Sequence, residues 1–142
     1  RDGAGMVDRW LVDKSAFVRL DRSEDAELWR ERIDRGLVGV STVTLLELGF
    51  SARSGQDWSA GLQGPPVSKL LLESMTPKME SRALAVQGML AERGFHRAAK
   101  VPDLLIAAVA EMSGYTVLHV DRDFELIAEV TGQPIERLSM PS

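Results

Sequence analysis

The sequence predicts a single α/β domain of three layers, in which helices cover both faces of a central, mostly parallel sheet. Short β-prone apolar runs alternate with segments of helical periodicity over most of the chain. The length of 142 residues suits one domain with a real core, and the 44% hydrophobic and 27% charged content is ordinary for a globular protein. No internal repeat or low-complexity tract interrupts the alternation.

The chain begins with a short strand and two helices. An apolar, β-prone run at Trp10–Val12 predicts a strand that ends at Asp13. Residues 14–20 predict a short helix, and residues 24–35 predict a second helix that Gly36 ends. The apolar side of the second helix consists of Leu28, Trp29 and Ile33.

A second strand precedes a less regular region. Residues 37–40 predict the strand, and residues 42–52 predict a helix with Glu47 in its middle. The apolar positions at helical spacing in this helix are Val43, Leu46 and Phe50. Residues 53–66 are rich in Gly, Ser, Gln and Pro, so we expect mostly loop there, with at most one turn around Trp58.

Two helices are the clearest features of the middle of the chain. Residues 67–74 are ambiguous, with a helical start and room for a short strand before Thr76. Pro77 suits the first turn of a helix that Gly94 ends. Its apolar stripe consists of Met79, Ala83, Val86 and Leu90. Residues 102–112 predict a helix that is apolar nearly all round, which suggests a buried, central position.

The last elements are a strand at 115–120, a helix at 122–130 and an edge strand at 135–138. Ligands of open α/β sheets bind outside the carboxyl ends of the strands. Asp13 and Asp121 each follow a predicted strand, so both are candidates for a binding site.

Composition excludes several kinds of chemistry. The chain has no cysteine, which excludes disulfides, thiol catalysis and cysteine-ligated metals and agrees with the cytoplasmic location that we expect. Only His96 and His119 are present, so histidine triads and H-E-x-x-H zinc sites are not supported. The longest apolar run, 104–112, is interrupted by Glu111 and is too short to span a bilayer, so we expect no membrane partner.

Four carboxylates lie beside or inside apolar stretches: Asp13, Glu47, Asp103 and Asp121. A lone charge is costly to bury, and like charges raise one another's pKa. A divalent cation relieves both costs, and ligation by oxygen alone suits Mg²⁺ or Mn²⁺. This pattern predicts metal-dependent phosphoryl chemistry. The net charge of −4 argues at first against a nucleic-acid partner, but neutralising these acids with metal leaves the remaining surface about neutral.

Each acid also has a purely structural explanation. Asp13 and Asp121 suit helix N-caps, and Asp103 suits a helix N-terminus, where the dipole stabilises an anion. Glu47 fits the polar face of an amphipathic helix. Asp123 is a fifth acid, for which a solvent-facing or helix-capping position is favoured. The joint arrangement, more than any single acid, carries the prediction of a metal site.

With these residues the chain resembles the PIN-domain ribonucleases, in particular the VapC-type toxins of bacterial VapBC toxin–antitoxin modules. The motifs that carry the resemblance are Val12-Asp13-x-Ser15-Ala16, Glu47 after Thr44, Pro102-Asp103 with Ile106-Ala107-Ala108, and Asp121-x-x-Phe124 followed by Ile127. All four occur in order, at suitable intervals, over about residues 10–138. We assign residues 6–140 to a PIN-like nuclease domain and residues 1–5 to a cloning remnant or a disordered start.

The resemblance implies a central parallel sheet, an acidic pocket that holds Mg²⁺ or Mn²⁺, and cleavage of single-stranded or looped RNA, such as tRNA or rRNA loops. By motif position, the catalytic and metal-binding roles fall to Asp13, Glu47, Asp103 and Asp121, with Asp13 and Asp103 as first choices for direct ligands. Ser15 matches a position that supports the site by hydrogen bonding. One metal and two metals both remain open.

The resemblance also implies partners, namely a VapB-type antitoxin, an RNA substrate and a second copy of the chain in a homodimer. Residues 53–66 with Trp58 are a candidate antitoxin contact, although Trp58 could equally pack on its own core. A basic rim is needed because carboxylates repel RNA. The candidate RNA-binding residues are Arg93, His96, Arg97 and Lys100, for which a solvated helix end is an equally good explanation.

Two positions depart from the family pattern. Lys14 stands where threonine or serine is usual, and His119 stands where threonine is usual. Three other functions stay open: a PIN-type nuclease of RNA maturation, a non-catalytic PIN-like binding module, and a receiver-type phosphoacceptor. The phosphoacceptor normally needs a lysine late in the chain, whereas Lys100 is the last one and precedes the helix of Asp103.

Overall fold

A computed structural model describes residues 8–142, so the remnant expected at residues 1–5 and the domain start at Met6 lie outside the described part of the chain. Five strands form one sheet with the order β3-β2-β1-β4-β5, and every pair of neighbours runs parallel. The strands are β1 (Trp10–Val12), β2 (Val38–Ser41), β3 (Leu71–Glu73), β4 (Thr116–His119) and β5 (Ile135–Arg137). The central β1 is buried along its whole length, as expected for a strand covered on both faces.

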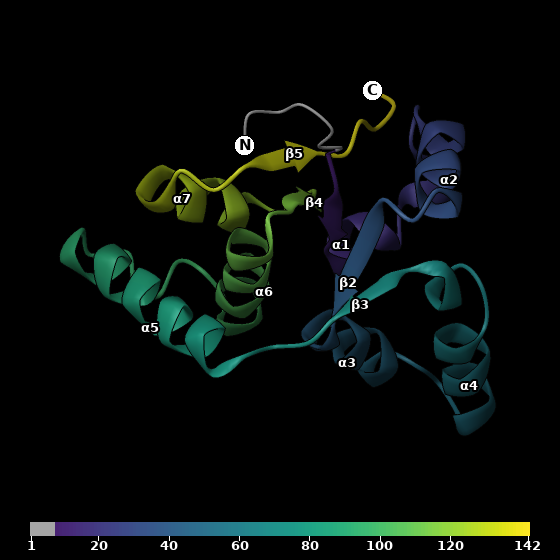
Figure 1. The fold of residues 1–142 in the computed structure, drawn as a ribbon, viewed down its shortest axis with the longest axis horizontal. Coiled ribbons are helices and arrows are strands. Elements are labelled where there is room, and N and C mark those ends of the chain that lie inside the picture. The colour runs from purple at the N-terminus through teal and green to yellow at the C-terminus, as the bar shows by residue number, and fades with distance from the viewer. Residues whose placement is uncertain (1–7) are drawn as a thin grey trace.

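Within the described residues, the α-helices are α1 (Lys14–Phe17), α2 (Ala26–Asp34), α3 (Thr42–Phe50), α4 (Gly55–Gln63), α5 (Pro77–Glu92), α6 (Val101–Ser113) and α7 (Arg122–Thr131). Helices α5, α6 and α7 lie on one side of the sheet and α1 and α2 on the other, with α3 and α4 at one end (Figure 1). The predicted three-layer α/β architecture is therefore confirmed. Helix α1 is shorter than the expected 14–20, because the chain turns into a 3₁₀ segment at Leu20–Arg22.

The core consists of two apolar clusters, one on each face of the sheet. On one face, Leu11 of β1 packs in a cluster with Ile106 of α6 and Phe124 of α7. On the other face, Val12 packs in a cluster with Trp29 of α2. Neighbouring residues of β1 thus point to opposite faces, as the pleat of a strand requires. Most residues of α6 from Asp103 to Ala110 are buried, as predicted, which places Asp103 inside the protein, where the site lies.

Helix α5 confirms the prediction from periodicity. All four residues of its apolar stripe, Met79, Ala83, Val86 and Leu90, are buried. The Thr76 side chain accepts a hydrogen bond from the Met79 backbone N–H at 3.3 Å, and Pro77 occupies the first turn. Gly94 follows the helix with a φ of +78°, a conformation that suits glycine.

The prediction of mostly loop at 53–66 is wrong, because helix α4 occupies most of this range. Ser54 caps the helix by accepting a hydrogen bond from the Asp57 N–H at 3.1 Å. Trp58 packs so closely on Gly49 of α3 that a Cβ added at Gly49 would lie 2.6 Å from Trp58 Nε1. This contact between helices stabilises a segment whose glycine and serine content disfavours a helix on its own.

Two predicted apolar faces are only partly buried. In α2, Trp29 and Ile33 are buried but Leu28 is exposed. In α3, Leu46 and Phe50 face outward, and Phe50 is 91% exposed. Because α3 lies at the end of the sheet and not over a face, the regular spacing of its apolar residues marks an exposed surface.

Gly39 in β2 has no room for a side chain. A Cβ there would lie 3.0 Å from the Leu71 carbonyl oxygen of β3 and 3.0 Å from the Tyr115 hydroxyl, which donates a 2.6 Å hydrogen bond to Glu73. We expect Gly39→Ala to lower the free energy of unfolding by about 1–3 kcal/mol, because the crowded groups must shift. Urea denaturation measures this. Gly88→Ala in α5 is the matched control, because open space surrounds Gly88; an equal effect in both variants would contradict the explanation.

Candidate active site

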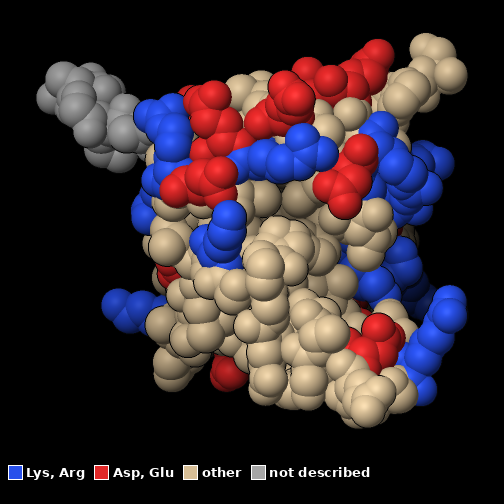
Figure 2. Space-filling view, turned by 90° about the vertical axis from the view of Figure 1, so that its right-hand side faces the viewer, with Lys and Arg blue, Asp and Glu red and all other residues tan. Residues whose placement is uncertain are grey.

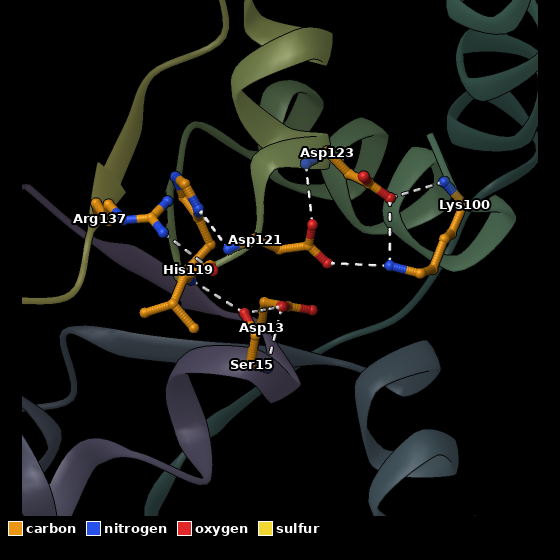
Figure 3. A network of polar contacts seen from close by, with 8 residues as sticks. Asp13, Ser15, Lys100, His119, Asp121, Asp123 and Arg137 are labelled. Atoms are coloured by element: carbon orange, nitrogen blue, oxygen red, sulfur yellow. Dashed lines mark hydrogen bonds and ion pairs between the residues drawn. The ribbon is translucent and has the colours of Figure 1, made fainter. Parts of the chain in front are cut away.

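The four acids predicted from the sequence converge at the carboxyl ends of β1 and β4, where Figure 3 shows Asp13 and Asp121 directed toward the same space. Asp103 lies in the first turn of α6 and Glu47 lies in α3. Their charges influence one another, as the pKa shifts below show. The convergence follows from topology, because parallel strands all end at the same edge of a sheet.

Ser15 joins the ends of the two central strands. Asp13 is buried, and its Oδ2 accepts hydrogen bonds from the Ser15 backbone N–H at 3.0 Å and from Ser15 Oγ at 2.5 Å. The Ser15 Oγ in turn accepts a hydrogen bond from the Val120 N–H at 3.0 Å. The Ser15 hydroxyl thus links Asp13, which follows β1, to Val120, which follows β4. The second oxygen of Asp13 takes no part in these contacts.

Asp121 is the N-cap of α7. Its Oδ1 accepts a hydrogen bond from the Asp123 N–H at 2.9 Å, and its own N–H donates to Nδ1 of the buried His119 at 3.1 Å. Burial alone would raise the pKa of Asp121, but the Asp123 N–H and the Lys100 ammonium outweigh it and hold that pKa below its usual value. Asp121 is therefore ionised at neutral pH, with Oδ2 directed into the site.

Asp103 has the most perturbed environment of the acids. It is 4% exposed, and its Oδ2 has no hydrogen-bond partner in the described part of the chain. Burial, and then contact with the Asp123 carboxyl group and the charges of Asp13 and Asp121, raises the pKa of Asp103 to about 9. Without a cation, Asp103 therefore holds a proton at neutral pH.

Glu47 approaches the group from α3. Burial, followed by the charge of Asp13, raises its pKa, whereas Lys14 and Lys100 lower it by a smaller amount. Its buried Oε1 has no hydrogen-bond partner among residues 8–142. Glu47 and Asp103 thus each bring an unsatisfied oxygen to the same region.

The expectation that Asp123 faces solvent or caps α7 is wrong. The cap is Asp121, and the Asp123 side chain is only 14% exposed. Carboxylate oxygens of Asp103, Asp121 and Asp123 all lie within 4.8 Å of one another. The D-x-D spacing of Asp121 and Asp123 could have predicted this position of Asp123. With Asp121 as the N-cap, Asp123 lies in the first turn of α7, where helical side chains tilt toward the N-terminus of the helix. Asp123 is thus a fifth acid of the site.

The donor set fits a hard divalent cation. All the candidate ligands are oxygens, which Mg²⁺ and Mn²⁺ prefer. Local hydrogen bonds engage one oxygen each of Asp13 and Asp121, which leaves the other oxygen of each available. The buried, unpaired oxygens of Asp103 and Glu47 need a partner to offset their desolvation. A cation among these groups would supply it.

The predicted basic residues behave differently from one another. Arg93, His96 and Arg97 are exposed in the connection between α5 and α6. The Lys100 ammonium instead points into the site, 3.4 Å from Asp121 Oδ2 and 3.7 Å from Asp123 Oδ2 (Figure 3). Lys14, which is close enough to lower the pKa of Glu47, donates a 2.6 Å hydrogen bond to Ser51 Oγ. The rim of the acidic site thus carries two lysines.

Comparison with known sequences places the chain in a family. The PIN domain family model matches residues 10–130. Ribonuclease VapC2 of Mycobacterium tuberculosis (strain CDC 1551 / Oshkosh) is 56% identical over 131 residues, which cover 92% of this chain and 93% of that protein. Ribonuclease VapC51 of M. tuberculosis (strain ATCC 25618 / H37Rv) is 40% identical, with the same coverage of 92% and 93%.

Solved structures agree on the fold. VapBC2 from Rickettsia felis, bound to a promoter DNA fragment, contains a chain that matches with a TM-score of 0.76 and 16% identity, covering 92% of this chain and 98% of that one. DNA-bound VapBC from Salmonella typhimurium matches with a TM-score of 0.73, 21% identity and coverage of 92% and 98%. The family model and the close relatives lead to one conclusion. This chain is a member of the PIN domain family, of the VapC type.

Proposed function

We propose that this chain is the toxin of a type II toxin–antitoxin module and a Mg²⁺- or Mn²⁺-dependent endoribonuclease that cleaves structured RNA, with tRNA or rRNA loops as substrates. One observation carries the catalytic part: carboxylate oxygens of Asp103, Asp121 and Asp123 lie within 4.8 Å of one another. The charges of Asp13 and Glu47 belong to the same group, because Asp13 raises the pKa of both Glu47 and Asp103. Among residues 8–142, Asp103 and Glu47 each leave a buried oxygen unpaired. Relatives that are 56% and 40% identical bear the name ribonuclease, which supports RNA as the substrate.

The residues of the chain have distinct roles in this proposal. Asp13, Asp103, Asp121 and Asp123 would hold the cation, which would polarise the phosphodiester and acidify a water molecule. Glu47 accepts the proton of the attacking water: its pKa is raised by burial and its Oε1 is free of protein partners among residues 8–142. Asp121 suits that role less well, because the Asp123 N–H engages its Oδ1 and its pKa is lowered, which makes it a weaker base. Arg93, His96 and Arg97 bind RNA phosphates outside the acidic site.

Cleavage of a structured RNA tests the proposal, with Asp13→Asn as the informative variant. Asparagine also caps helices well, so α1 keeps its cap while the site loses a charge. We expect Mg²⁺-dependent cleavage by the wild type, none in chelator, and a loss of at least about a hundredfold in Asp13→Asn. Asp34→Asn, an exposed acid paired with Lys69, should cleave normally. Undiminished cleavage in chelator or in Asp13→Asn would refute the assignment.

We propose that a VapB-type antitoxin binds the outer surface of α3 and α4. The face seen in Figure 2 carries its charged groups mostly in the upper part, and the lower part, where α4 lies, is largely uncharged. Exposed apolar side chains of this region are Leu46, Phe50, Trp58 and Leu72. Exposed apolar surface of this kind marks a protein interaction site. Trp58 packs against Gly49 between α3 and α4, and its exposed part remains a candidate antitoxin contact.

Phe50→Asp tests the antitoxin surface. Because Phe50 is 91% exposed, the variant should fold and cleave RNA like the wild type. Its affinity for a cognate VapB-type antitoxin should fall at least tenfold, since buried aromatic anchors carry much of the energy of an interface. Titration calorimetry measures this affinity. The matched control is Val18→Asp, an exposed apolar residue of a different segment; equal losses in both variants, or none in either, would contradict the surface.

We further propose that two copies of the chain associate and that they act in the cytoplasm. Leu84 of α5 and Val101 of α6 are exposed beside Leu105 and line one shallow apolar depression, which suits a second copy.

Across residues 8–142, no helix combines the length and the apolar character that a membrane crossing requires.

A further inference from the structure

Lys100 contacts two acids of the site through its side chain and its backbone. Its ammonium lies 3.4 Å from Asp121 Oδ2 and 3.7 Å from Asp123 Oδ2. Its backbone N–H donates a 2.9 Å hydrogen bond to Asp123 Oδ2. Figure 3 shows the side chain folded back toward these two carboxylates and not outward. Lys100 also directly precedes α6, the helix that carries Asp103.

The ammonium contacts oxygens that a divalent cation would also need. Asp121 Oδ1 is engaged by the Asp123 N–H, so Oδ2 is the oxygen left for a metal, and Lys100 contacts that oxygen. The separations of 3.4 and 3.7 Å are long for hydrogen bonds, so the attraction is mainly ionic. A Mg²⁺ ion binds oxygen at about 2.1 Å with twice the charge. The two cations therefore compete for the same carboxylates, and the metal forms the stronger contacts.

Displacement of the ammonium needs no rearrangement of the fold. The Lys100 side chain is 69% exposed, so the ammonium can return to water by rotation of its own stem. The backbone N–H remains bonded to Asp123 whether or not the ammonium leaves. Asp123 is thus held in place in both states.

We propose that Lys100 is a built-in counter-ion of the acidic site, which neutralises Asp121 and Asp123 in the metal-free protein and must be displaced by the divalent cation. Lys100 thereby sets the metal affinity of the site. This inference rests on the proposed function and changes the role expected for Lys100: in the metal-free protein its charge serves the acids and not an RNA phosphate.

Calorimetric titration of Mn²⁺ into chelator-treated protein tests this role. Lys100→Met keeps the length of the stem and the backbone hydrogen bond but removes the competing charge. We expect it to bind Mn²⁺ roughly three- to tenfold more tightly than the wild type, in line with the modest strength of exposed ion pairs. Its melting temperature in chelator should be lower than that of the wild type, and saturating Mn²⁺ should remove the difference. Lys100→Gln provides a second variant with a polar side chain.

Two other lysine-to-methionine variants serve as controls, because each removes one positive charge, as Lys100→Met does. Lys69, an exposed lysine, pairs at 3.0 Å with the exposed Asp34. This pair lies ahead of β2 and β3 and thus at the opposite end of the strands. Lys14 lies near Glu47 but bonds to Ser51. Lys69→Met should leave the Mn²⁺ affinity within about twofold of wild type, and Lys14→Met should raise it less than Lys100→Met does.

The outcomes separate the inference from the function on which it rests. If the wild type binds Mn²⁺ and Lys100→Met binds it equally or more weakly, the counter-ion role is overturned and the proposed nuclease stands. An equal gain in Lys69→Met would also overturn it, because net charge alone would then explain the effect. If neither the wild type nor Lys100→Met binds Mn²⁺, both the metal-dependent function and the role of Lys100 fail.

Discussion

Asp103→Asn is expected to make the metal-free protein more stable while abolishing RNA cleavage. Asp103 is buried among Asp13, Asp121 and Asp123, and these surroundings raise its pKa to about 9. Asparagine has the same shape, carries no charge, and its amide can donate hydrogen bonds to the neighbouring carboxylates. We expect a gain of about 1–3 kcal/mol in the free energy of unfolding at neutral pH. Cleavage should fall at least about a hundredfold, because one ligand of the cation is lost.

The gain in stability of Asp103→Asn over the wild type should increase as the pH rises. The folded pKa of Asp103 lies above its ordinary value of 3.8, so between these values the native state binds more protons than the unfolded state. Asp103 therefore lowers the stability of the wild type progressively as pH rises through this window. Asparagine does not titrate, so the difference in melting temperature between Asp103→Asn and the wild type should grow from pH 5 to pH 8.

Thermal melts in chelator at several pH values measure this effect. A second series with saturating Mg²⁺ should raise the melting temperature of the wild type and leave that of Asp103→Asn nearly unchanged, because a ligand that binds only the native state stabilises it. Asp34→Asn, which alters an exposed acid, is the control for loss of one negative charge. A metal-free Asp103→Asn protein that melts below the wild type at pH 8 would show that Asp103 is a stabilising acid and not a strained ligand.

The sequence predicts the packing of a helix correctly where the apolar side of that helix faces the protein's own core. In α5, the stripe at Met79, Ala83, Val86 and Leu90 packs into the core beside α6 and α7, so helical periodicity coincides with burial. In α3, the same kind of spacing places Leu46 and Phe50 on the outside. Periodicity reports that a helix has an apolar side, but it does not report whether the protein's own core or a partner covers that side.

The site was predictable to a similar extent. Residues that directly follow strands could be placed at one edge of the sheet, because topology alone brings Asp13 and Asp121 together. The inclusion of Asp123 and the inward turn of Lys100 depend on side-chain direction around the N-terminus of α7, and a one-dimensional pattern carries little of that information. The structural and functional explanations of Asp13 and Asp121 also prove compatible, since each carboxylate caps a helix with one oxygen.

His119→Ala is expected to cause the largest loss of stability near the site. The imidazole is fully buried, packs 5.4 Å from the Phe124 ring and accepts the Asp121 N–H through Nδ1. Alanine would leave a cavity and an unpaired, partly buried Asp121 N–H, which together cost about 2–5 kcal/mol. Asp121 would also lose the acceptor that orients its backbone. RNA cleavage per folded molecule should therefore be lower in His119→Ala than in the wild type.

His119→Asn separates the two contributions, because the asparagine side-chain oxygen can accept a hydrogen bond but fills less space. We expect it to restore cleavage per folded molecule while recovering only part of the stability. Burial lowers the pKa of His119 below 6.5, so the wild type loses stability as pH falls below that value, and His119→Asn should lack this loss. Urea denaturation at pH 7.5 and pH 5.5, with cleavage assayed at the higher pH, tests both points. Equal cleavage per folded molecule in His119→Ala and in the wild type would mean that His119 only fills the core.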